Sequence, residues 1–175
     1  MTFSALAQNL ANPSALVRFV DASGTAPGVG NYAQWATQSD LIGSSGVTIS
    51  SGQITLPQGY YWLIEAMLQT QLLGGGPFSS TRIVDFEVYD VTNSVSIGSL
   101  ATLNDSVWSG AESSQLYSRD ECSRCWVDTQ SASRIIAVRQ VSITGYTIPG
   151  ELNYDSFSAG QDYSGQSRLF CWRFD

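Results

Sequence analysis

Short apolar runs separated by turn residues follow one another along most of the chain from Val47 onward. The run with the fewest charges is Ile54 to Gln71, ITLPQGYYWLIEAMLQTQ. Pro57 presets the backbone of a turn and Gly59 supplies the freedom to leave it, and the aromatic and aliphatic residues that follow prefer an extended, packed backbone. Short strands alternating with turns predict an all-β fold, an antiparallel jelly roll or β-sandwich.

The strand predicted from Tyr60 to Gln71 is apolar on both faces. One face consists of Tyr60, Trp62, Ile64, Ala66 and Leu68, and the other of Tyr61, Leu63, Glu65 and Met67. Because antiparallel sheets normally keep one polar face, this strand needs a second sheet on one side and a further partner on the other. We therefore expect an oligomer whose subunit interface includes Tyr61, Trp62, Leu63 and Met67. The register leaves open whether the face of Leu63 or that of Trp62 meets the neighbour.

The same reasoning predicts strands elsewhere in the chain. They cover Ala15–Val20, Val47–Ile49, Gln53–Leu56, Ile83–Val91, Val95–Leu100, Trp126–Val127, Ile135–Ile143 and Arg168–Phe174. Tyr32 to Trp35 is expected to pair briefly before a turn-rich segment from Ser39 to Gly46, and Gly145 to Gly165 is expected to form a long loop.

The length of 175 residues suits one domain. We divide the chain into residues 1–46, an N-terminal arm with the first short strands, and residues 47–175, the jelly-roll β domain. Met1 to about Asn12 is either a short helix ended by Pro13 or a disordered or partner-bound arm. The apolar residues expected to contact a partner are Phe3, Leu6, Leu10 and Phe19.

The surface is expected to be poor in charge and acidic. Charged residues make up 13% of the chain, and 15 acidic residues against 8 basic ones give a net charge of -7. A surface of this kind suits packing against other proteins, and without a basic cluster it does not suit nucleic acid. No apolar run reaches the length of a membrane span and no signal peptide is recognisable, so we expect synthesis in a cytoplasm and no membrane partner.

Candidate chemistry is sparse, because the chain has no His. This excludes Ser-His-Asp and Cys-His arrangements and His-containing metal sites. Asp85 and Glu87 lie on one face of a predicted strand, about 7 Å apart, and such a pair can serve a glycosidase. A solvated sheet face is the favoured interpretation, and we expect no enzymatic activity and no cofactor.

Three further groups of residues are candidate sites. Cys122 and Cys125 form a C-x-x-C motif, for which structural or incidental thiols are favoured over a disulfide or a metal contact. Turn chemistry is favoured over Ca²⁺ for a group of oxygen-bearing residues, which are Asp90, Asn93, Asn104 and Asp105. Aromatic residues of the long loop either stack on sugars or pin the loop, and they are Tyr146, Tyr154, Phe157 and Tyr163.

Three short motifs occur between Ile49 and Leu100. The first is Leu56, Pro57, Gly59 and Tyr61 running into an apolar strand, the second is Asp90, Val91, Thr92 and Asn93, and the third is Ile97 and Gly98. With the later strand SASRIIAVRQVSI, from Ser131 to Ile143, and the terminal Leu169 to Phe174, they resemble the C1q/TNF-like jelly rolls of tailed-phage virion proteins. The first forty or so residues and the Gly145 to Gly165 loop have no counterpart in that resemblance.

The resemblance implies a homotrimer on a virion. The expected protein is a capsid cement or decoration protein, made in the host cytoplasm, that binds the major capsid protein on the outer surface of the head through the N-terminal arm. The alternative is a tail-fibre or receptor-binding module that recognises a host surface glycan through the Gly145 to Gly165 loop. A His-free glycosidase is the third possibility.

Overall fold

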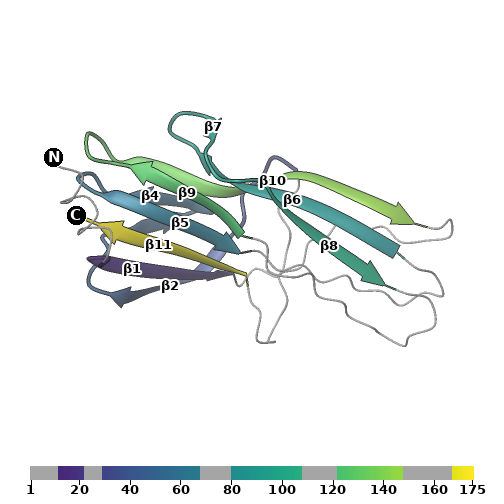
Figure 1. The fold of residues 1–175 in the computed structure, drawn as a ribbon, viewed down its shortest axis with the longest axis horizontal. Coiled ribbons are helices and arrows are strands. Elements are labelled where there is room, and N and C mark those ends of the chain that lie inside the picture. Colours follow the sequence, from purple (N-terminus) through teal and green to yellow (C-terminus); the bar gives the residue numbers. More distant parts are fainter. Residues whose placement is uncertain (1–11, 22–28, 68–79, 108–121, 148–166) are drawn as a thin grey trace.

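The chain folds into a jelly-roll β-sandwich of two antiparallel sheets (Figure 1). The computed structural model describes residues 12–21, 29–67, 80–107, 122–147 and 167–175. None of these residues lies in a helix, and hence none forms a helix with the length and apolar character of a membrane span. The all-β prediction is confirmed.

Successive strands from β4 onward mostly alternate between the two sheets, as in a jelly roll. The first sheet contains β1 (Ala15–Asp21), β2 (Trp35–Ile42), β5 (Tyr61–Met67), β9 (Cys122–Asp128) and β11 (Arg168–Phe174), in the order β2-β1-β11-β5-β9. The second contains β3 (Thr48–Ser50), β4 (Gln53–Leu56), β6 (Ser80–Asp90), β7 (Val95–Ser96), β8 (Ala101–Val107) and β10 (Arg134–Thr147). Its order is β3-β4-β10-β6-β7, with β8 also paired to β6.

The long strands β6 and β10 reach beyond the sandwich. Their pairing shifts register between Gln140 and Ser142, after which residues 142–147 of β10 pair with residues 80–85 of β6. β8 pairs with the same part of β6. Figure 1 shows this three-stranded ribbon extending past the ends of β5 and β11.

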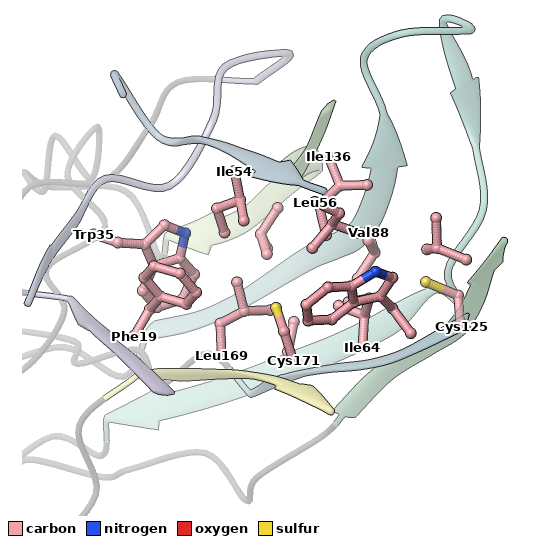
Figure 2. Close-up of a cluster of buried hydrophobic side chains, with 14 of the residues drawn as sticks. Phe19, Trp35, Ile54, Leu56, Ile64, Val88, Cys125, Ile136, Leu169 and Cys171 are labelled. Carbon is pink, nitrogen blue, oxygen red and sulfur yellow. The ribbon is translucent and has the colours of Figure 1, made fainter. Parts of the chain in front are cut away.

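The core lies between the two sheets and is built from alternate residues of their strands (Figure 2). Trp62 and Ile64 of β5 are completely buried, as are Phe19 of β1 and Phe86 of β6. Their burial follows from the period of two in a strand, which sends every second side chain to the same side. Ile54, Leu56, Ile136, Val138, Leu169 and Cys171 complete the centre of this cluster.

Thr129, just after β9, fixes the turn that leads into β5. The Trp62 indole N–H donates to the Thr129 hydroxyl at 3.2 Å, and the hydroxyl oxygen lies 2.8 Å from the Pro57 carbonyl and 2.9 Å from the Tyr60 carbonyl. Gly59 takes the positive φ of 103° that the turn requires, and its N–H donates to the Thr129 carbonyl. The turn predicted at Pro57 is therefore held by a residue about 70 positions later in the chain.

Most predicted strands are present, but two were missed. β2 covers part of the segment predicted to be turn-rich between Ser39 and Gly46, and β8 was not foreseen.

The division of the chain at residue 46 does not follow the sheets, because β1 and β2 both belong to the first sheet. Phe19 is a core residue with no exposed surface, so its prediction as a partner contact was wrong. The other arm residues, Phe3, Leu6 and Leu10, lie outside the described residues.

Thr129→Val is expected to destabilise the fold by about 1–3 kcal/mol, because it leaves the buried Trp62 N–H without an acceptor. Chemical denaturation followed by tryptophan fluorescence measures this loss. Thr129→Ser is the matched control, since it keeps the hydroxyl and should retain most of the stability. An equal loss in both variants would show that the methyl group, not the hydrogen bond, is responsible.

Candidate subunit interface

An apolar row crosses all five strands on the outward side of the first sheet. Residues paired across antiparallel strands point to the same side. The pairs Ile42 with Leu16, Leu16 with Trp172, Trp172 with Leu63 and Leu63 with Trp126 make this row continuous. Because Trp62 and Ile64 point into the core, this row faces away from it.

Further aromatic side chains flank the row on β5 and β11. Phe174 pairs with Tyr61 and packs on Trp126 with a centroid distance of 5.3 Å, and Phe170 lies 6.4 Å from Trp172. Together these residues define the outer apolar face, whose members are Leu16, Ile42, Tyr61, Leu63, Met67, Trp126, Phe170, Trp172 and Phe174. Trp126 is 54% exposed and Ile42 is 43% exposed. Large contiguous apolar patches are unusual on monomers and mark interaction sites.

Glu65 is the acidic group in the middle of this face. One of its carboxylate oxygens pairs with the Arg124 guanidinium at 2.9 Å, and the other accepts the Trp172 indole N–H at 3.0 Å. The Glu65 side chain is 18% exposed whereas that of Arg124 is 63% exposed. The carboxylate is therefore held in the plane of the face, with a cation that reaches into solvent beside it.

Two arginines on the β1 and β11 side of the face have no ionic partner among the described residues. Arg18 lies opposite Phe170, and Arg168 lies opposite Val20 and Met67. Within the described part of the chain neither makes an ion pair or a side-chain hydrogen bond, and the Arg18 Nε is buried without a partner. The face therefore carries positive charge on this side, and the described part of the chain supplies no counter-ion for it.

The structure separates the four residues predicted to form a subunit interface. Tyr61, Leu63 and Met67 lie on the outer apolar face, half-buried. Trp62 does not, because its place in the alternation sends it into the core, where it has no exposed surface. That part of the prediction was wrong, and the open question of which side of the strand faces outward is answered in favour of Leu63.

Sequence reasoning missed the aromatic half of the face on β11. The segment Arg168–Phe174 places Leu169 and Cys171 on one side and Phe170 and Trp172 on the other. This is the same two-sided apolar pattern as in β5, so the signal was available. Leu16, Ile42 and Trp126 become members of the face only through strand pairing, which the sequence alone does not provide.

The carboxylate pair weighed for a glycosidase lies on the outer side of the second sheet, and both groups are bonded. Asp85 accepts hydrogen bonds from Thr102 at 2.7 Å and Ser142 at 2.6 Å. Glu87 pairs with Arg139 at 2.6 Å and accepts from the Ser96 hydroxyl at 2.9 Å. Their partners come from neighbouring strands of the same sheet, so the two carboxylates tie the surface of that sheet together.

The C-x-x-C motif does not bring its thiols together. Three residues apart on β9, Cys122 points outward and Cys125 inward, and both are free thiols, as is Cys171. Burial, with a smaller contribution from Asp90, raises the pKa of Cys125 to about 12, and burial likewise raises the pKa of Cys171. Burial also raises the pKa of Cys122, although Arg124 opposes it. Among the described residues no group of acidic, Cys or His side chains is arranged to hold a metal.

Asp90 and Asn93 have a turn function. The Asp90 carboxylate accepts the Asn93 backbone N–H at 3.0 Å and its side-chain amide at 2.7 Å, which closes the turn between β6 and β7. The side chains of Asn104 and Asp105 lie outside those described, as does that of Tyr146. Tyr154, Phe157 and Tyr163 fall in residues that are not described, so the structure does not test their role.

In the folded protein, alkylation by iodoacetamide at pH 8 is expected to modify Cys122 and to spare Cys125 and Cys171. Burial protects the last two and keeps them as unreactive neutral thiols. Peptide mass spectrometry with and without denaturant measures the modification at each site. Rapid native modification of Cys171 would contradict its place in the core.

Neither protein-family models nor curated proteins give a match to the chain. The functional proposal therefore depends on the outer apolar face and on the resemblance carried by the motifs between Ile49 and Leu100.

Proposed function

We propose that this protein is a structural component of a phage virion, a homotrimeric cement or decoration protein that binds the major capsid protein on the outer surface of the head. The observation that carries the proposal is the outer apolar face, which runs across all five strands of the first sheet. Double-sheet jelly rolls are common in viral capsid proteins, and the sequence motifs resemble those of phage virion proteins.

The outer apolar face supports self-association in particular. Its row offers the aliphatic and aromatic side chains of Ile42, Trp172, Leu63 and Trp126 but little hydrogen-bonding capacity, and the buried Leu16 packs beneath the row. Aromatic residues are enriched in protein interfaces and charged residues are depleted at their centres. A copy of the same face supplies a surface of the same chemistry, and a cyclic arrangement of three copies covers the face of each.

In this proposal the head lattice is bound by another part of the protein. The apolar residues Phe3, Leu6 and Leu10 are the proposed contacts to the major capsid protein, since the outer apolar face is used between copies. The proposal includes no nucleic acid, membrane, cofactor or catalytic residue. The net charge of -7 disfavours binding to a phosphate backbone.

Immunogold electron microscopy of intact virions, with antibody raised against the purified chain, tests the location. Gold over the head is the expected result. Gold at the tail tip would favour the alternative, a receptor-binding module for a host glycan. An absence of labelling on virions whose genome encodes this chain would contradict both virion functions.

Leu63→Asp is expected to abolish assembly, because it places an unpaired charge in the desolvated centre of the contact. Such a charge costs roughly 3 kcal/mol or more, which raises the dissociation constant more than about a hundredfold. Size-exclusion chromatography with light scattering measures the mass at micromolar concentration.

Val95→Asp is the matched control for Leu63→Asp. Val95 is 47% exposed on β7 of the second sheet, away from the outer apolar face. This variant should keep the trimeric mass. Loss of the trimer in both variants, or a monomeric mass for the unmodified protein, would contradict assembly through this face.

A further inference from the structure

The outer apolar face is divided into two sides of different charge. Outward positions of β1 and β11 carry Arg18 and Arg168 and no carboxylate among the described side chains. Outward positions of β5 and β9 carry Glu65 and Asp128 together with Arg124. One side is therefore cationic, and the other has a small excess of negative charge.

Arg18 and Glu65 lie at the same level along the strands. Arg18 pairs with Phe170, and Phe170 in turn pairs with Glu65, so two strand spacings separate the arginine from the carboxylate. That separation is about 10 Å, and the Phe170 ring position lies between them. Within one chain the structure does not join these two groups.

Covering Arg18 without a carboxylate is unfavourable. Its Nε is already buried and has no acceptor among the described residues. A neighbouring surface that is purely apolar would remove water from the guanidinium and offer no counter-charge. Whatever covers this side of the face must therefore bring a hydrogen-bond acceptor to Arg18, and a carboxylate supplies the counter-charge as well.

A second copy of the chain brings such a group to the right place. When three copies surround a three-fold axis parallel to the strands, with this face turned toward the axis, the β1 and β11 side of one copy lies against the β5 and β9 side of the next. Residues at equal levels then meet, which places Glu65 of the second copy opposite Arg18. The chain is acidic overall, and Glu65 is the carboxylate at this level of the face.

We propose that Arg18 of one copy binds Glu65 of the neighbouring copy, an inference that rests on the proposed assembly through the outer apolar face. Glu65 has capacity for this contact, since a carboxylate accepts about four hydrogen bonds and only Arg124 and Trp172 are seen to use it within the described residues. The 63% exposure of Arg124 leaves that side chain free to move aside. This ion pair fixes the offset, along the strand direction, between the first sheets of two neighbouring copies. The apolar row alone does not fix that offset.

A double-mutant cycle on the full chain tests the pair. Dissociation constants are measured by sedimentation equilibrium for the unmodified protein, Arg18→Met, Glu65→Gln and the double variant. Each single variant is expected to weaken assembly at least about tenfold, and the double variant no more than either single one. Arg18→Met should also make assembly less sensitive to salt, because it removes the screened ion pair.

Two controls separate this contact from changes within one chain. Arg139→Met breaks the ion pair with Glu87 on the second sheet and should leave the dissociation constant unchanged. Arg18→Lys keeps the charge and should recover part of the affinity if Arg18→Met reduces the amount of folded protein. Thermal unfolding of each variant identifies any that fail to fold.

The possible outcomes are distinct. Independent effects of the two substitutions in a protein that still assembles would overturn the Arg18 to Glu65 contact and leave the trimer in place. A monomeric unmodified protein would overturn the assembly and, with it, this contact.

Discussion

Two neighbouring strands of the first sheet, β5 and β11, are apolar on both faces, and this constraint governs the rest of the structure. The second sheet covers one face, where Trp62, Ile64 and Cys171 are completely buried. A sheet has two sides, however, and the sandwich supplies a cover for one. The outward side of the first sheet, with Leu63, Trp172 and Phe170, is also hydrophobic. No other sheet in the described part of the chain covers it. Folding therefore satisfies half of the pattern, and the proposed trimer satisfies the other half.

The sequence predicts those strands whose packing is visible in their own pattern. β5, β10 and β11 combine β-branched and aromatic residues with a clear alternation, and their starts lie within one residue of the predicted ones. β10 runs on to Thr147, however, so residues 145–147 form a strand where a loop was predicted. β2 escaped detection because WATQSDLI is polar and lies at the edge of its sheet, where one neighbour, β1, suffices to hold it. β8 likewise pairs with β6 alone among the described strands. Edge strands have weak patterns because fewer of their side chains are buried.

The candidate interface could be predicted in part for the same reason. Alternation sorts Leu63 and Trp62 onto opposite sides of β5, but it does not say which side the second sheet covers. That depends on which strands of the other sheet lie above it, a long-range property. The contribution of Leu16, Ile42 and Trp126 depends on pairing between strands that are far apart in the chain. The C-x-x-C motif shows that one spacing has different consequences in different elements. In a turn or helix it would bring the two thiols together, but in the strand β9 it places them on opposite sides.

The position of β11 between β1 and β5 also determines when the first sheet can form during synthesis. The Ser14 hydroxyl donates to the Arg173 carbonyl, 159 positions later, and β11 is the strand that pairs with both β1 and β5. A ribosome thus releases β1, β2, β5 and β9 before the strand that joins them exists. Closing so distant a contact is slow compared with local pairing. The outer apolar face consequently arises as a continuous surface only once β11 has docked, so the proposed self-association is open only to chains whose sandwich is already complete.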